Sequence, residues 1–266
     1  MASTNRSVER AIRLLRHVAD ASGPIRFTEL QVATGIPKGT LHGLLASLEA
    51  TDFVHHTPRG YEIGIVAFEV GTAVRAPVSL RAAASPLLDD LFTSHGEACH
   101  FGLLSQGDVT YLDVRESVHA LRFTQRTGAR KPAYSTALGK AMLALQTDAA
   151  IAATYPSRLP SLTANTIPTR AGLLECVKQI RENGYATESE ESTPGVCCIG
   201  VAGILDSLIY GLSITVPVQR AQVEDLPRFL PSLTTTLSRL NSSLTTREWF
   251  TPGSLAKSAG NLATSW

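Results

Sequence analysis

The chain has 266 residues, a formal net charge of +1 and 44% hydrophobic residues, which is enough apolar material for one large or two ordinary domains. The near-neutral balance excludes binding to nucleic acid through bulk positive charge, and no apolar run reaches the ~20 residues of a membrane span. Four cysteines in no metal-ligand spacing, without a signal peptide, predict a reduced cytoplasmic protein.

A first helix is expected to begin after a loose tail of about six residues. Ser7 can cap this helix, and apolar residues recur on one face between residues 8 and 18. Residues 21–24 combine small residues with glycine and proline, so the helix is expected to end there.

Residues 27–49 predict two short helices joined by a tight turn. Thr28 is the expected N-cap of the first helix, and Gln31 completes a capping box three residues later. Gly35 suits a left-handed helix end, and Pro37 suits the start of the second helix. This second helix has one apolar stripe, formed by Leu41, Leu44, Leu45 and Leu48.

The opposite face of the second helix has small, polar or basic side chains, namely Lys38, Gly39, Thr40, His42, Gly43, Ala46 and Ser47. Such residues can approach a phosphate backbone or a groove without steric cost. In a helix-turn-helix, the second helix lies in the DNA major groove. The alternative is an ordinary helical hairpin within a core, since such hairpins are common units.

A hairpin is expected next, because the β-type runs 53–56 and 61–63 flank a turn that contains proline and glycine. Three helices followed by a hairpin predict a winged helix-turn-helix over residues 1–63. Arg59 at the hairpin tip can reach a minor groove or a phosphate. Residues 1–76 have eight basic and seven acidic side chains, so DNA binding would depend on local placement of charge and on dimerisation.

Residues 64–77 are expected to form a linker helix, with Ala76 and Pro77 marking a domain boundary. The helix is apolar on nearly all sides, so it should pack against more than one surface. A second copy of the chain is the expected partner.

Residues 78–248 mix strands and helices without a regular βαβ alternation. They therefore predict an α+β domain with a mainly antiparallel sheet flanked by helices. Residues 249–266 are small and polar without periodicity, and they predict a flexible tail. Helices are expected at about 80–92, 133–145, 169–184 and 223–240, and strands at about 99–105, 109–115, 119–126, 185–190, 197–205 and 211–217.

Several of these segments resemble the IclR-type transcriptional regulators over residues 7 to about 245. In the first part the matching segments are SVERAIRLL, TGIPKGTLHGLLASLE and the YEIG that closes the hairpin. In the second part they are RTGARKPAYSTALGKAMLA and IRENGYATESEESTPGVCCIG. Two long motifs in the right order beside a winged helix make the resemblance specific.

The resemblance implies a homodimer or homotetramer whose subunits join a winged DNA-binding domain to a GAF-like effector domain. Effectors in the family are typically small acids or aromatic metabolites. The family usually has Ser where Gly39 stands and Arg where Gly43 stands, so the operator contacts of this chain are expected to differ. The DNA-binding candidates are Arg26, Thr28, Lys38, Thr40, His42, Ser47 and Arg59.

Carried over to this sequence, the effector pocket of the family comprises Thr136, Ala137, Leu138, Glu188, Cys198, Ser213 and Thr215. Ser213 and Thr215 alternate along one strand, so both hydroxyls lie on the same side. Backbone amides near Thr136 favour an anionic or carbonyl oxygen. Glu188 can accept a hydrogen bond from a ligand or hold a loop. Tyr134, Phe101, Phe123 and Tyr210 can wall an apolar pocket, although a place in the core is the more common one for each of these aromatic residues.

The adjacent Cys197 and Cys198 also suggest a redox or metal site. Neighbouring side chains on a strand point to opposite faces, however, so they do not easily share one ion. A buried structural role is expected instead.

Together these features predict a DNA-binding transcriptional repressor that is controlled by a small organic effector, without a cofactor or metal. A second reading is an enzyme on a GAF-like domain, but the sequence has no catalytic triad order, nucleophile elbow or phosphate loop. A third reading is a small-molecule-binding or assembly module with weakened DNA binding, which Gly39 and Gly43 suggest.

Overall fold

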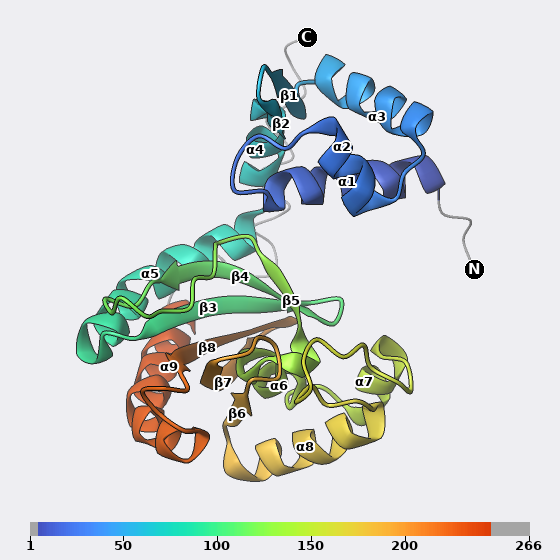
Figure 1. Cartoon of the computed structure of the whole chain (residues 1–266). Coiled ribbons are helices and arrows are strands. Elements are labelled where there is room, and N and C mark those ends of the chain that lie inside the picture. The colour runs from blue at the N-terminus through green and yellow to red at the C-terminus, as the bar shows by residue number, and fades with distance from the viewer. Residues whose placement is uncertain (1–4, 246–266) are drawn as a thin grey trace. The chain divides into compact units, whose positions relative to one another are not determined.

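The computed structural model describes residues 5–245, and the chain divides into two compact units between Val78 and Ser79. Each unit is taken by itself below (Figure 1). The tail expected at residues 249–266 lies outside the described residues. Within residues 5–245, no helix is long and apolar enough to cross a membrane.

The first unit has three helices around a small core, followed by a two-stranded hairpin and a further helix. Leu14, Leu30, Leu41 and Leu45 are at most 1% exposed and join the three helices in one apolar cluster. The elements are α1 (Arg6–Asp20), α2 (Phe27–Thr34), α3 (Lys38–Ala50), β1 (Val54–Thr57), β2 (Gly60–Ile63) and α4 (Ile65–Thr72).

Both expected helix caps in this unit were wrong. Helix α1 begins two residues earlier than a Ser7 cap requires, because the N-cap is Asn5, whose side chain accepts hydrogen bonds from the backbone N–H groups of Ser7 and Val8. Helix α2 begins at Phe27, so Thr28 lies inside its first turn. Its start is stabilised by the carboxylate of Glu29, which accepts a hydrogen bond of 2.8 Å from the backbone N–H of Arg26.

The turn and the hairpin that follow have the predicted form. Gly35 ends α2 with a φ of 63°, a conformation that favours glycine, and α3 begins directly after Pro37. Strands β1 and β2 pair in antiparallel register, and Ile25 adds two backbone hydrogen bonds to Tyr61 of β2. The hairpin is thereby tied to the segment that leads into α2.

The linker is divided differently from the expectation. Helix α4 ends at Thr72, and a new helix, α5 (Arg75–His95), runs through the expected boundary at Ala76 and Pro77. Proline is tolerated here because the first turn of a helix has backbone N–H groups without an intrahelical partner. Helix α4 has no buried residue, and its Ile65, Phe68 and Val70 side chains are exposed.

The second unit is built on a six-stranded sheet in which every neighbouring pair is antiparallel. The order across the sheet is β5-β4-β3-β8-β7-β6, so the two long hairpins meet at the centre through β3 and β8. The strands are β3 (Ala98–Ser105), β4 (Asp108–Arg115), β5 (Arg130–Pro132), β6 (Ala186–Ser189), β7 (Val196–Leu205) and β8 (Leu208–Pro217).

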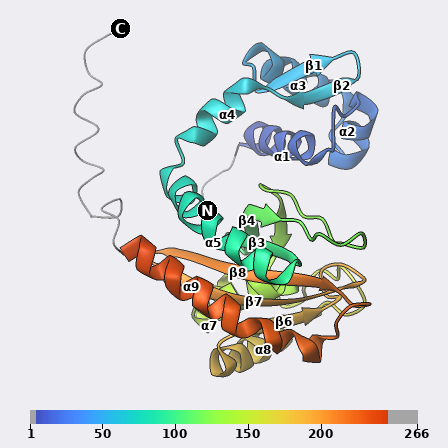
Figure 2. The same cartoon turned by 90° about the vertical axis from the view of Figure 1, so that its left-hand side faces the viewer.

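Helices cover both faces of this sheet. On one face, α5, the 3-10 helix η2 (Val223–Phe229) and α9 (Leu230–Thr245) pack on the largest apolar cluster, and Figure 2 shows α9 lying along the strands. On the other face lie the 3-10 helix η1 (Ala133–Ser135), α6 (Ala137–Leu143), α7 (Asp148–Thr154) and α8 (Arg170–Asn183). The α+β class is confirmed, and so is the mainly antiparallel sheet flanked by helices.

One expected strand was wrong, and one helix was missed. Residues 119–126 are irregular, and the third strand is the shorter β5. Gly128 has a φ of 84° and donates its N–H to Tyr111, so the chain turns onto the sheet only after this glycine. Helix α7, capped by the hydroxyl of Thr147, was not expected.

Candidate functional site

Helix α3 buries one face and leaves the other open to solvent. Leu41 and Leu45 are buried, with Leu44 and Leu48 half-buried beside them. The opposite side chains are all exposed, as the pattern predicts: Lys38, Gly39, Thr40, His42, Gly43, Ala46 and Ser47. The hydroxyl of Ser47 donates to the backbone oxygen of Gly43 at 2.9 Å, which leaves its lone pairs available to a partner.

The two glycines make this face flat. A Cβ added at Gly39 or Gly43 would meet no heavy atom within 4 Å, and neither residue has a positive φ. Nothing in the fold of this unit therefore requires glycine at either position. The absence of side chains there brings the backbone of α3 within reach of an approaching surface.

The remaining DNA-binding candidates of the first unit lie around the hairpin tip and the start of α2. Arg59 stands at the tip, where its N–H donates to the hydroxyl of Thr57 at 3.2 Å. Arg26 and Arg59 line one surface hollow together with Glu29, and Thr28 is exposed in the first turn of α2. The structure thus gives every DNA-binding candidate an exposed side chain, as contact with DNA would require.

In the second unit, the structure brings the predicted effector residues together around one cavity. All seven candidates line it: Thr136, Ala137, Leu138, Glu188, Cys198, Ser213 and Thr215. The remaining lining residues are His100, Tyr111, Phe123, Lys131, Ser192 and Val196. These six come from strands and loops far apart in the sequence, and only Phe123 among them was expected.

The lining follows a polar row that crosses all six strands. In strand order it runs from Lys131 on β5 through Tyr111, His100, Ser213 with Thr215, and Cys198 to Glu188 on β6. The register supports this row, since His100 lies opposite Ser213, Thr215 opposite Cys198, and Cys198 opposite Glu188. A cationic side chain stands at one end and a carboxyl group at the other.

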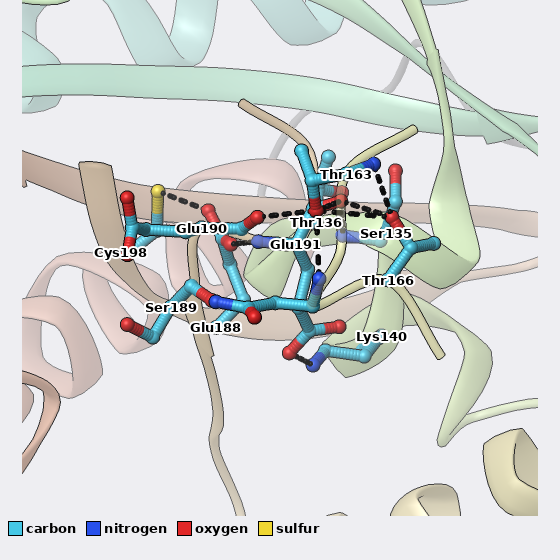
Figure 3. Close-up of polar contacts among 12 residues, drawn as sticks. Ser135, Thr136, Lys140, Thr163, Thr166, Glu188, Ser189, Glu190, Glu191 and Cys198 are labelled. Atoms are coloured by element: carbon cyan, nitrogen blue, oxygen red, sulfur yellow. Dashed lines mark hydrogen bonds and ion pairs between the residues drawn. The ribbon is translucent and has the colours of Figure 1, made fainter. Parts of the chain in front are cut away.

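Glu188 is 1% exposed and is held by two hydrogen bonds. The thiol of Cys198 donates to its Oε1 at 2.9 Å, and the backbone N–H of Glu191 donates to its Oε2 at 2.9 Å (Figure 3). Burial raises the pKa of Glu188, and the two donors partly offset that effect. Both oxygens of Glu188 are therefore engaged, and its first role is to fix the start of the following loop.

That loop is also fixed by a buried ion pair and two threonines. Nζ of Lys140 on α6 lies 2.5 Å from Oε1 of Glu191, with the lysine side chain only 2% exposed. The hydroxyl of Thr166 donates to the backbone oxygen of Glu191 at 2.7 Å, and that of Thr163 to Glu190 at 2.6 Å (Figure 3). The loop after β6 is thus tied to α6 and to the segment before α8.

At the opposite end of the row, Lys131 is partly buried over an aromatic ring. Its Nζ lies 4.8 Å from the ring centroid of Phe123 and donates to the hydroxyl of Thr193 at 2.7 Å. Burial lowers the pKa of Lys131, an effect that the nearby Cys198 and Glu188 oppose. An ammonium with unused N–H groups beside an aromatic face can hold a carboxylate.

His100 is the central unexpected residue. It is 2% exposed, and burial, reinforced by Lys131, lowers its pKa to about 4, so its ring is neutral at pH 7. Its Nδ1 lies 3.5 Å from the hydroxyl of Thr215. The alternation of β3 alone did not identify His100, because only the register against β8 places it beside Ser213.

Of the four aromatic residues that could wall the pocket, only Phe123 lines it, and the other three are core residues, the role that was more expected for each. Phe101 and Tyr210 belong to the apolar cluster on the other face of the sheet. Tyr134 belongs to the second cluster, and its hydroxyl donates to the backbone oxygen of Pro160. Phe123 and the unexpected Tyr111 provide the aromatic lining instead.

The cavity is small in this structure. Its volume is ≈ 10 Å³, about what one water molecule requires. A ligand larger than water would therefore have to separate its walls. Thr136 is the N-cap of α6, and its hydroxyl accepts a hydrogen bond from the backbone N–H of Gly139. This hydroxyl is therefore less available to a ligand than expected.

The two adjacent cysteines lie on opposite faces of β7, as expected. The thiol of Cys197 approaches the backbone oxygens of Val216 and Ala221 in the large apolar cluster, whereas that of Cys198 lines the cavity. Among the described residues, no group of three or more histidine, cysteine or acidic side chains is placed to hold a metal ion.

Comparisons with known families agree with this division of the chain. The family described as the IclR helix-turn-helix domain matches residues 7–58. The family described as the bacterial transcriptional regulator IclR C-terminal matches residues 72–241. Both domains are thus matched in the order in which the structure presents them.

Individual relatives match over nearly their whole length. The HTH-type transcriptional regulator XynR of Escherichia coli is 29% identical over 85% of this chain and 92% of its own. The transcriptional repressor IclR of the same species is 28% identical over 84% of each chain. An IclR homologue from Microbacterium hydrocarbonoxydans, solved in complex with 4-hydroxybenzoate, has the same fold with a TM-score of 0.75 at 17% identity, covering 91% of this chain and all of the other.

Proposed function

Because this chain belongs to the IclR family of bacterial transcriptional regulators, we propose that it is a repressor whose DNA binding is controlled by a small organic acid. The effector binds in the cavity on the sheet of the second unit. The observation that carries this proposal is the convergence of all seven effector candidates, from four separate segments, on one buried cavity.

The DNA-binding step is proposed to use the exposed face of α3. This face carries Lys38 and His42 as basic groups, and the backbone at Gly39 and Gly43 is uncovered. A recognition helix of this kind lies in the major groove, while Arg59 on the wing contacts the backbone or minor groove. The repressor role draws on relatives such as the repressor IclR of Escherichia coli.

The effector is proposed to be a small or aromatic acid. Lys131 can pair with a carboxylate, and Phe123 and Tyr111 offer faces to a flat apolar body. A homologue with the same fold has been solved with 4-hydroxybenzoate, which has this chemistry.

Dimerisation would supply the two recognition helices that a two-fold operator needs. Helix α4 exposes Phe68 (69%), Ile65 (62%) and Val70 (57%) on one short segment, and an apolar surface of this kind favours burial against another chain. Half-sites one helical turn apart require recognition helices about 34 Å apart. The proposed assembly is a homodimer or a homotetramer.

The small size of the cavity suggests how an effector controls DNA binding. A ligand that fits only when the cavity walls separate binds one conformation better than another, and this difference in affinity is what shifts the equilibrium between them. The proposed shift changes the spacing of the two α3 helices and so the affinity for the operator.

The experiment is a titration of purified protein against DNA from its own promoter region at several salt concentrations. Salt-dependent, sequence-selective binding supports the proposal, because each phosphate that the protein neutralises releases counterions. A parallel thermal-shift screen with small carboxylic acids, phenols, amides and hydrazides tests the effector, since a ligand raises the melting temperature by mass action. Ligand binding without DNA binding would instead support a sensing or assembly module, which the two glycines of α3 favour.

A further inference from the structure

His100 contains a buried ring nitrogen that no group in the described part of the chain satisfies. Its Nε2 has no hydrogen-bond partner there, although the residue is 2% exposed and lines the cavity. Leaving a buried polar atom unpaired is costly, so the few that persist in a fold call for an explanation. The other ring nitrogen, Nδ1, contacts the hydroxyl of Thr215 at 3.5 Å.

The contacts beyond Thr215 determine which nitrogen of His100 has the proton. Burial and the neighbouring Glu188 raise the pKa of the Cys198 thiol, so the thiol keeps its proton, and it donates this proton to Oε1 of Glu188 at 2.9 Å. The sulfur of Cys198 can then only accept from the hydroxyl of Thr215, which lies 3.1 Å away.

A hydroxyl has one proton, so Thr215 cannot also donate to His100. Its oxygen must instead accept from Nδ1–H, which assigns the proton of the neutral imidazole to Nδ1 and leaves Nε2 with a bare lone pair. Every link in this relay points the same way, from His100 through Thr215 and Cys198 to Glu188, and it crosses four neighbouring strands. Hydrogen bonds aligned in this way strengthen one another.

We propose that this relay fixes His100 as an acceptor, so that Nε2 receives a hydrogen bond from a hydroxyl or N–H group of the effector and makes His100 the residue that selects for it. The proposal rests on the effector function of the cavity. Together with Lys131, which stands at the opposite end of the row from Glu188 and can pair with a carboxylate of the effector, it narrows the effector class from small acids to acids that also bear a hydrogen-bond donor, with hydroxy acids as the first members.

The aromatic surroundings of the ring agree with this assignment. Tyr111 and Phe123 meet the imidazole edge-on, with centroids at 5.5 Å and 6.5 Å. These side chains pack against the ring and restrict its rotation. A donor on the effector is then needed to satisfy Nε2 once the cavity has opened.

The tautomer can be measured on the full-length protein without any ligand. Histidine labelled with ¹⁵N gives separate shifts for protonated and bare ring nitrogens, and a His100→Gln variant identifies the signal of His100. We expect a protonated Nδ1 and a bare Nε2 in the wild type, and a mixture of tautomers in Thr215→Val, which has no acceptor. Thr215→Ser keeps the hydroxyl and should keep the wild-type tautomer. A protonated Nε2 in the wild type overturns the proposal.

The selectivity is tested by calorimetry with 4-hydroxybenzoate and benzoate, which differ only in the hydroxyl. We expect the wild type and Thr215→Ser to prefer 4-hydroxybenzoate by about tenfold or more, as the removal of one buried hydrogen bond implies. In Thr215→Val and in His100→Phe the preference should largely disappear. Equal affinity of the wild type for both acids, or binding of neither, overturns the assigned effector class.

Failure of this proposal differs from failure of the regulator function. If His100 is the wrong tautomer or benzoate binds equally well, salt-dependent binding to promoter DNA is unaffected and the regulator function stands. The opposite result is that the protein does not bind DNA but prefers 4-hydroxybenzoate, and that Thr215→Val loses this preference. That result supports the selectivity of the cavity and contradicts the regulator function.

Discussion

Nζ of Lys140 lies 2.5 Å from Oε1 of Glu191, and this buried pair joins α6 to the loop that follows β6. Lys140 is the charged side chain that helix α6 places in an otherwise apolar interior, since every residue of α6 is buried. The pair therefore connects two walls of the cavity, because the start of α6 and the residues around this loop both line it.

Lys140→Ala should lower the free energy of unfolding by about 3–5 kcal/mol, because it leaves the Glu191 carboxylate buried without its partner. Urea denaturation followed by circular dichroism measures the decrease. A double variant, Lys140→Met with Glu191→Met, removes both charges and should recover much of that stability. A double variant as unstable as Lys140→Ala would contradict the assignment of the decrease to an uncompensated charge.

Lys38→Ala should weaken binding to all DNA sequences alike and flatten the dependence of affinity on salt. The slope of log K against log salt concentration should fall by roughly 0.9 for each phosphate that the variant no longer neutralises. Gel-shift titrations at several salt concentrations measure it. Lys178→Ala, which removes an exposed charge from α8 in the other unit, is the matched control and should leave the slope unchanged.

Gly39→Ala and Gly43→Ala should each stabilise the first unit by roughly 1 kcal/mol, because glycine costs about that much relative to alanine inside a helix. Both positions offer open space for a Cβ. Thermal unfolding measures the gain. Gly64→Ala is the contrasting variant, since its Cβ would lie 1.9 Å from the backbone oxygen of Asp52, and it should destabilise the same unit. A lower stability of Gly39→Ala or Gly43→Ala would show that the exposed face has a packing role.

Ser213→Ala should abolish the response to the effector without unfolding the protein. Ser213 is 3% exposed beside His100, so its hydroxyl is placed to meet a ligand in the cavity. Calorimetry with 4-hydroxybenzoate measures the affinity, and the melting temperature checks folding. Ser207→Ala in the exposed turn between β7 and β8 is the control. Retained affinity in Ser213→Ala would remove this residue from the binding site.

Acid should destabilise the protein through His100. Its pKa is about 4 in the folded chain and 6.5 in the unfolded chain, so between these values the unfolded state binds more protons. Stability therefore decreases as pH falls from about 6.5 to 4, by on the order of 3 kcal/mol from this residue. Urea denaturation at a series of pH values measures the fall. His100→Gln should show a shallower fall, and an unchanged profile would mean that the imidazole is not held neutral.

The sequence alone predicted those features of the fold that depend on a local, periodic pattern of residues. The leucine stripe of α3, the glycine end of α2 at Gly35 and the alternation of Ser213 with Thr215 depend on neighbours a few residues away, and the structure has them as predicted. Helix caps were less predictable, because several nearby side chains compete for the same N–H groups. The N-cap of α1 is Asn5 and not Ser7. At the start of α2, the carboxylate of Glu29 and not the hydroxyl of Thr28 accepts the backbone hydrogen bond.

The centre of the cavity was decided only by the tertiary structure. His100, Tyr111 and Lys131 come from β3, β4 and β5, and nothing in their own segments identifies them as residues of one ligand site. The pairing of β3 with β8 places His100 beside Ser213, and the turn at Gly128 brings β5 onto the sheet. Strand register is set by contacts distant in sequence, and a shift of one residue would turn His100 to the opposite face. By itself, the sequence predicted most of the elements, the family and eight of the thirteen residues that line the cavity, whereas the register of the sheet decided which polar groups meet inside the cavity.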